Sequence, residues 1–224
     1  MDINNFFFNN LHVDNWQMNE SERFSLLGLL LFLKPKWVLE LGTFKGGATS
    51  LFSKYSERVI TVDIDPTCKL ITAKLSNVTQ IISSSDEFLP NFVNKINYGL
   101  QECPDLILVD ALHTKIGVQS DLNNLLKLAV FRTPTIILIH DSGNTECRSG
   151  ILSVDWTANP FLKYLDVDFV PGRIIEHGGG GHGEVWGGFA IAIFDNTKEF
   201  NLRVPIVKSA DLMIDYLNNY TVST

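Results

Sequence analysis

A glycine-broken junction between an apolar strand and a helix constrains this chain more than any other feature. The segment VLELGTFKGGATSLF runs from Val38 to Phe52. Its apolar start is typical of a buried strand, and apolar residues return at helical spacing after Gly46 and Gly47. Such a turn exposes free backbone N–H groups, and glycine lets a ligand lie against the backbone. The junction therefore predicts a ligand site.

The spacing of the glycines narrows the class of ligand. Gly42 is followed by Gly46 and Gly47, which is neither the Gly-x-Gly-x-x-Gly of dinucleotide folds nor the Gly-Lys-Ser/Thr of a phosphate-binding loop. The strand also carries an acid, Glu40. A carboxylate at this position suits a ligand with a cationic amine better than one with phosphates.

The next predicted strand adds a second acid. Residues 58–63 end in Asp63, about 20 residues after the glycine turn, where a nucleotide-binding unit places its ribose-binding acid. Asp65 and Pro66 follow and fit the N-cap and first residue of a helix. We therefore expect Asp63 to bind ligand and Asp65 to be structural.

Together these segments resemble the class I S-adenosylmethionine-dependent methyltransferases. VLELGTFKGG is similar to their first motif and VITVDIDP to their second, and the resemblance covers roughly residues 16–194. It is closest to small O-methyltransferases of the catechol type and to those acting on macrolide sugars. The resemblance implies S-adenosylmethionine as cofactor. It also implies a Rossmann-like, doubly wound α/β fold with a seven-stranded mixed sheet in the order 3-2-1-4-5-7-6.

The remaining pattern alternates strands and helices, which predicts a mainly parallel sheet covered on both faces, with sites at the carboxyl ends of its strands. Asn19 and Glu22 form a capping box for a helix that ends near residue 33. Residues 142–164 are expected to be irregular. We predict further strands at 37–41, 78–82, 105–110, 135–139, 165–170 and 189–194, and helices at 66–75, 86–97, 115–131 and 209–218.

Four polar side chains end two neighbouring strands of this expected sheet. Asp110 and His113 follow the fourth strand, and His140 and Asp141 end the fifth. Singly, such residues are more often caps, loop anchors or hydrogen-bonded core histidines. Together, beside the expected cofactor site, they favour a catalytic crevice.

Methyl transfer to oxygen requires an aligned acceptor and removal of its proton. A histidine can act as general base near neutral pH, and a divalent metal can lower the pKa of the hydroxyl. The resemblance implies that Asp110 binds metal or faces the sulfonium, that His113 is the base, and that Asp141 is a second metal ligand. His140 departs from the family pattern because nitrogen suits magnesium poorly. Either the metal is a transition ion such as manganese or iron, or His140 points elsewhere, and a metal-free mechanism with His113 as base stays open.

Three other segments carry weaker signals. Ser85 and Asp86 follow the third strand, where they either contact the adenine ring, as the resemblance implies, or cap a helix. Asp121 either approaches this edge of the site or occupies a solvated helix position, which we favour. In HGGGGHGEVW, at residues 177–186, a His/His/Glu metal set competes with a flexible hairpin, which we favour, or a lid with Trp186 as an apolar wall.

The irregular segment 142–164 is the other candidate wall of the acceptor site. It contains Arg148, Trp156 and Asn159, which could line that wall.

Size and charge limit the function classes. With 224 residues and 45% apolar content, we expect an N-terminal arm and helix (1–35) and one S-adenosylmethionine-binding domain (36–224). The net charge of −7 argues against nucleic acid, and no apolar run reaches the ~20 residues of a membrane span. Three widely spaced cysteines and no signal peptide favour the cytoplasm. We expect residues 1–15 to form an arm that packs on the body or on a partner in a homo-oligomer.

The sequence thus favours O-methylation of a small hydroxylated acceptor, such as a sugar or a natural-product intermediate in biosynthesis. One rival is a non-catalytic nucleotide-binding or scaffold protein of the same fold, and another is a relative of the cephalosporin hydroxylases. An NAD-dependent oxidoreductase is disfavoured by the spacing from Gly42 to Gly47.

Overall fold

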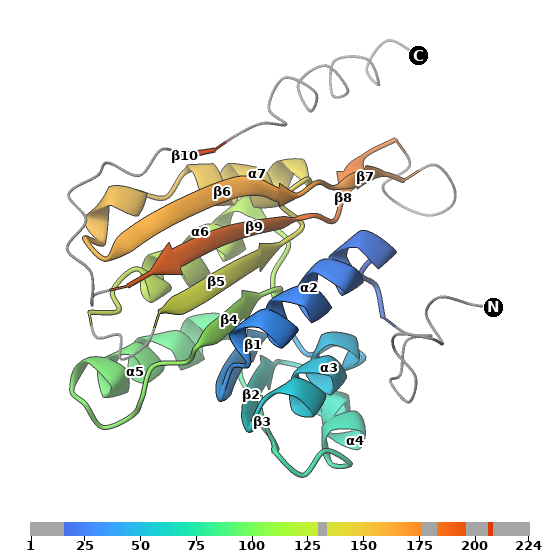
Figure 1. Cartoon of the computed structure of the whole chain (residues 1–224), viewed down its shortest axis with the longest axis vertical. Helices are drawn as coiled ribbons and strands as arrows, with labels where there is room; N and C mark the ends of the chain where they lie inside the picture. Colours follow the sequence, from blue (N-terminus) through green and yellow to red (C-terminus); the bar gives the residue numbers. More distant parts are fainter. Residues whose placement is uncertain (1–15, 130–133, 176–182, 196–205, 208–224) are drawn as a thin grey trace.

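The computed structural model describes residues 16–129, 134–175, 183–195 and 206–207 (Figure 1). The predicted arm and the predicted helix 209–218 lie outside these residues, as do His177 and His182.

One large sheet forms the centre of the molecule. Its strand order is β10-β6-β9-β5-β4-β1-β2-β3, and β9 runs antiparallel to both of its neighbours while the other pairs are parallel. The predicted order of seven strands is confirmed, and β10 extends the sheet at one edge. The strands are β1 Trp37–Leu41, β2 Arg58–Asp63, β3 Val78–Ile82, β4 Leu106–Val109, β5 Thr135–His140, β6 Leu162–Val170, β9 Phe189–Phe194 and β10 Ile206–Val207.

Helices cover both faces of this sheet (Figure 1). Side chains alternate along each strand, so that Leu39 joins the core with α5, α6 and α7 while Val38 joins the core with α2 and α3. The result is a three-layer α/β fold with two apolar cores. The α-helices are α2 Glu20–Leu33, α3 Gly47–Tyr55, α4 Lys69–Thr72, α5 Ser85–Asn97, α6 Lys115–Leu125 and α7 Thr145–Leu152.

The predicted starts of two helices are confirmed. The Asn19 side chain accepts from the Glu22 N–H, and the Glu22 carboxylate accepts from the Asn19 N–H. Asp65 caps a short 3₁₀ turn, η2 Pro66–Cys68, by accepting from the Thr67 N–H at 2.8 Å. Both caps satisfy backbone donors that a helix start leaves without partners.

Several element boundaries were predicted wrongly. Residues 142–164 are not irregular, because they contain α7, a 3₁₀ turn at Trp156–Ala158 and the first residues of β6. The helix expected at 66–75 is only η2 followed by α4, and the helix expected at 115–131 ends at Leu125. A short helix with few apolar residues leaves a weak periodic signal, which explains why α7 was missed. Apolar residues continue after Leu125, so the sequence pattern did not mark the end of α6.

A small hairpin stands beside the main sheet. β7 (Arg173–Ile174) pairs antiparallel with β8 (Val185–Trp186), which fits the hairpin predicted for this segment. Within the described ranges no helix is both long and apolar enough to cross a bilayer.

Candidate active site

A continuous pocket of about 730 Å³ lies along the carboxyl ends of the central strands. It extends from the glycine turn after β1 to Trp186 on β8. This is where ligands bind in open α/β sheets, and the volume suits a small-molecule site. Among the lining residues are all but one of the predicted site residues: Glu40, Gly42, Gly47, Asp63, Ser85, Asp86, Asp110, His113, His140 and Asp141.

The glycine turn has specific packing reasons for its glycines. Gly42 has a φ of +95°, and a Cβ there would lie 1.9 Å from the backbone oxygen of Asp110. A Cβ on Gly47 would lie 2.4 Å from the Trp16 ring. Gly46 is the predicted site residue that does not line the pocket, and it has left-handed backbone as the N-cap of α3. The turn therefore brings β1 against the loop after β4, and Gly46 serves its geometry.

Asp63 holds this turn in place. One carboxylate oxygen accepts from the N–H groups of Thr43 (2.8 Å) and Phe44 (2.9 Å), and the other accepts from the Asp65 N–H (2.9 Å). The carboxylate lines the pocket with a fixed orientation. Its free lone pairs are available to hydroxyl groups of a ligand.

Glu40 is a buried acid at the floor of the pocket. Its carboxyl accepts from Thr49 Oγ1 at 2.5 Å and from Thr61 Oγ1 at 2.6 Å. Burial raises the pKa of Glu40 to about 8, although the two threonine hydroxyls pull it down. Without a ligand the group is therefore mostly protonated at pH 7, and a cation bound beside it would favour the carboxylate.

The loop after β3 contradicts the capping interpretation of Ser85 and Asp86. The N-cap of α5 is Ser84, whose hydroxyl accepts from the Glu87 N–H, so neither Ser85 nor Asp86 is the cap. Both of these line the pocket, and Asp86 accepts from the Ser120 hydroxyl. Asp121 is not solvated as predicted, because its side chain is buried against this loop and burial raises its pKa to about 6.

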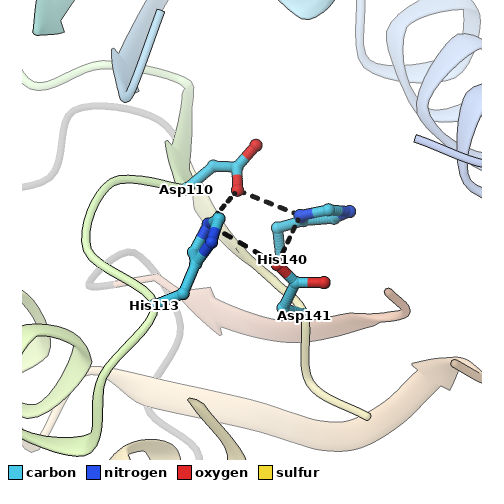
Figure 2. A group of neighbouring side chains, drawn as sticks. All are labelled: Asp110, His113, His140 and Asp141. Atoms are coloured by element: carbon cyan, nitrogen blue, oxygen red, sulfur yellow. Dashed lines mark hydrogen bonds and ion pairs between the residues drawn. The ribbon is translucent and has the colours of Figure 1, made fainter. Parts of the chain in front are cut away.

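The four residues at the ends of β4 and β5 meet in one cluster (Figure 2). One oxygen of Asp110 lies between the two imidazoles, 3.1 Å from His113 Nε2 and 2.9 Å from His140 Nδ1. Asp141 Oδ2 lies 3.5 Å from His113 Nε2 and 3.4 Å from His140 Nδ1. One donor atom from each residue falls within 4.8 Å of the others. The cluster is thus compact enough to surround one ion.

The charges in this cluster support one another. Burial alone would favour neutral groups, but Asp110 and the hydrogen bonds to Asp110, Asp141 and Glu22 raise the pKa of His140 well above its usual value. Burial raises the pKa of Asp110, but the charges and hydrogen bonds of His140 and His113 outweigh it and lower this pKa to about 2. The hydrogen bond between His113 and Asp110 raises the pKa of His113. His140 is therefore an imidazolium among carboxylates when no cation occupies the cluster.

Glu22 completes this arrangement, although its sequence pattern predicts only a role in the helix cap. Its Oε1 lies 3.2 Å from His140 Nε2 and accepts from the Gly188 N–H. The Gly187 N–H donates to Asp141 Oδ1 at 2.6 Å. Successive N–H groups of the turn between β8 and β9 thus hold the two carboxylates on either side of His140.

The donor set fits a divalent transition ion. Two carboxylates and two imidazoles are a mixed oxygen and nitrogen set, which suits manganese, iron or zinc better than magnesium. Figure 2 shows the Nε2 of His140 pointing away from the other three residues, so Nδ1 is its ligand atom. A cation there would replace the proton that Nδ1 shares with Asp110.

The walls of the acceptor end differ from the prediction. Trp186 does line the pocket, and its ring lies edge to face with His113 at a centroid distance of 6.1 Å. Arg148, Trp156 and Asn159 do not line it. Arg148 pairs with Asp168 at 2.8 Å, and the other two bond backbone carbonyls in the core. The 142–164 segment is therefore structural at these three positions.

One protein-family model matches the central part of the chain. Residues 39–142 match the family model described as a methyltransferase domain. This range includes the glycine turn, Asp63 and all four residues of the cluster. No curated protein sequence matches the chain significantly.

Solved structures share the fold at low sequence identity. An O-methyltransferase from Bacillus cereus, in complex with S-adenosylhomocysteine, is 17% identical over 82% of this chain and 86% of its own, with a TM-score of 0.55. The O-methyltransferase TomG from Streptomyces achromogenes, in complex with S-adenosylmethionine, is 14% identical over 79% and 81%, with a TM-score of 0.53. A Klebsiella pneumoniae protein is 18% identical over 80% and 82%, with a TM-score of 0.54.

Proposed function

We propose that this chain, whose residues 39–142 match the model of a methyltransferase domain, is a class I S-adenosylmethionine-dependent enzyme that methylates a hydroxyl oxygen of a small acceptor with the help of a divalent cation. A hydroxylated sugar or natural-product intermediate is the acceptor class. The observation that carries the proposal is the Asp110, His113, His140 and Asp141 cluster, which shares one pocket with the glycine turn. The Bacillus and Streptomyces proteins of similar fold are O-methyltransferases, which supports methyl transfer to oxygen.

The cofactor end of the pocket offers a partner for each polar part of S-adenosylmethionine. Asp63, held by the turn, accepts from the ribose hydroxyls. Glu40, at the buried floor, faces the cationic amino-acid portion. Ser85 and Asp86 contact the adenine ring, and Gly42 and Gly47 keep the turn close to the ligand. Bound in this way, the cofactor supplies the methyl group and directs it at the acceptor end.

His113 is the general base in this proposal. It is the exposed member of the cluster, with 41% of its side chain accessible, so an acceptor can reach it. Its Nε2 bonds to Asp110, which orients the ring and stabilises the imidazolium that forms when the acceptor loses its proton. Trp186 provides an apolar wall beside the ring.

Asp110, Asp141 and His140 Nδ1 are the ligands proposed for the cation, which when bound lowers the pKa of the acceptor hydroxyl. The chain's own part is to hold these three donors in one place before the acceptor arrives. The N–H groups of Gly187 and Gly188 do so by fixing Asp141 and Glu22.

The test is an assay for methylation of a panel of catechols and hydroxylated sugars, in which the release of S-adenosylhomocysteine is measured. Activity with manganese that is abolished by excess chelator supports the cation, and Asp110→Asn is expected to weaken manganese binding without unfolding the protein. Full activity in chelator would leave His113 acting with Asp110 alone. If the protein binds the cofactor but methylates none of the acceptors, the non-catalytic alternative is favoured.

A further inference from the structure

Glu22 makes more contacts than a helix cap requires. A capping box needs one carboxylate oxygen to accept from the N-cap N–H, and Oε2 does this for Asn19. The other oxygen of such a residue normally faces water. In this protein Glu22 is 1% exposed, and its Oε1 accepts from the Gly188 N–H and faces His140 Nε2 at 3.2 Å. A buried carboxylate with this many partners is held in one orientation.

The two nitrogens of His140 face different groups. Nε2 faces only Glu22 among the contacts described, whereas Nδ1 lies 2.9 Å from Asp110 and 3.4 Å from Asp141. The carboxylate of Glu22 can only accept when ionised, so it holds a proton on Nε2. Nδ1 is then the nitrogen with a lone pair to offer when a cation replaces its proton.

We propose that Glu22 is a positioning residue of the metal site, which holds Nε2–H of His140 and so presents Nδ1 to a divalent cation bound with Asp110 and Asp141. The inference rests on the proposed function, since it concerns the same cluster. Carboxylates that bond the second nitrogen of a ligating histidine fix its tautomer and orientation, and their loss typically weakens metal binding 10–100-fold. Glu22 would thereby make α2 a part of the site.

The decisive comparison uses Glu22→Gln with Glu20→Gln as its matched control. Glu20 lies on the same first turn of α2 but is exposed and away from the cluster. Calorimetric titrations of wild type and both variants with manganese chloride, and separately with S-adenosylhomocysteine, are run below their melting temperatures. We expect Glu22→Gln to bind manganese about 10–100-fold more weakly than wild type and to bind S-adenosylhomocysteine equally well. Glu20→Gln should match wild type in both.

The outcomes separate this inference from the proposed function. Equal manganese affinity in wild type and Glu22→Gln would make Glu22 a helix cap only. A wild type that binds the product but no manganese would overturn the role of Glu22 and leave the methyltransferase assignment standing. A wild type that binds neither would overturn both.

A measurement on wild type covers the case in which Glu22→Gln fails to fold. Nitrogen NMR of ¹⁵N-histidine protein loaded with zinc, a diamagnetic ion, reports which nitrogen of each imidazole carries a proton. The His140 signals are assigned by their absence in His140→Gln. We expect zinc on Nδ1 and a proton on Nε2, and zinc on Nε2 would contradict the proposal.

Discussion

His113 is the member of the cluster that an acceptor can reach, and its role has a kinetic signature. We predict that His113→Ala lowers kcat by about 10²–10⁴ and leaves the affinity for S-adenosylhomocysteine unchanged. The side chain is exposed, so the fold should survive the change. Because the bond to Asp110 raises the pKa of His113, the wild-type rate should fall as the pH drops through a value above the usual 6.5.

Steady-state kinetics over a pH series test this prediction, with circular dichroism as the check on folding. Normal turnover by His113→Ala would indicate that Asp141 or His140, and not His113, is the general base. A variant that melts early and binds the product poorly would make His113 a structural residue.

Glu40 gives a second prediction at the scale of one residue. Its pKa is raised from 4.5 to about 8 by burial, so folding favours the protonated acid and its contribution to stability is lost as the pH rises from 4.5 to 8. A bound cationic amine reverses this preference. We predict that S-adenosylmethionine binding at pH 7 releases about one proton from this site.

Titrations in two buffers with different ionisation enthalpies measure that proton. The binding heats should differ for wild type and agree for Glu40→Gln, which has no proton to release. Equal heats for wild type in both buffers would exclude Glu40 as the partner of the amine.

The residues of the cluster could be predicted because each follows an apolar run, and strand ends meet at one edge of a parallel sheet. Glu22 could not. It is 118 residues from His140 in the chain, and its capping-box pattern already explained an acid at that position. Only the packing of α2 across the sheet shows its second role. Asp121 was misjudged for the same reason, since its burial depends on the loop after β3.

The turn between β8 and β9 donates hydrogen bonds to both Asp141 and Glu22. Gly187 has a φ of +76°, and a Cβ there would lie 2.5 Å from Glu22 Oε1. Gly99 is a matched control, with a φ of +69° and nothing within 4 Å of a Cβ. We predict that Gly99→Ala loses only the backbone cost of about 1–2 kcal/mol, while Gly187→Ala loses more and also weakens manganese binding.

Urea unfolding and a manganese titration of the two variants measure these effects. Equal loss of stability in both, with unchanged manganese affinity, would show that the turn does not support Glu22 and Asp141.

Element boundaries were predictable where an apolar run or a helix cap marked them in the sequence. The strands β1, β2 and β3 and the start of α2 agree with the sequence prediction, because apolar runs and a capping box mark them. The helix α7 was missed. Its eight residues, TECRSGIL, bury Cys147, Arg148, Gly150 and Ile151, a mixed set that no apolar pattern reveals.

At the scale of the whole molecule, the sheet order was predictable through the resemblance and not from periodicity alone. Alternating strands and helices predict parallel pairing, but β9 lies antiparallel between β5 and β6. That reversal brings the β8–β9 turn, and with it Gly187 and Trp186, back to the carboxyl ends of β4 and β5. The acceptor end of the pocket therefore depends on the order of the last strands.

Binding of S-adenosylmethionine by the glycine turn and Asp63 is tested most directly by calorimetric titration with S-adenosylhomocysteine. We predict one saturable site per chain. Asp63→Ala should weaken it by the ribose hydrogen bonds, each worth about 0.5–1.5 kcal/mol, and by the loss of the bonds that hold Thr43 and Phe44. A folded wild-type protein that shows no binding of either the cofactor or its product would contradict the account.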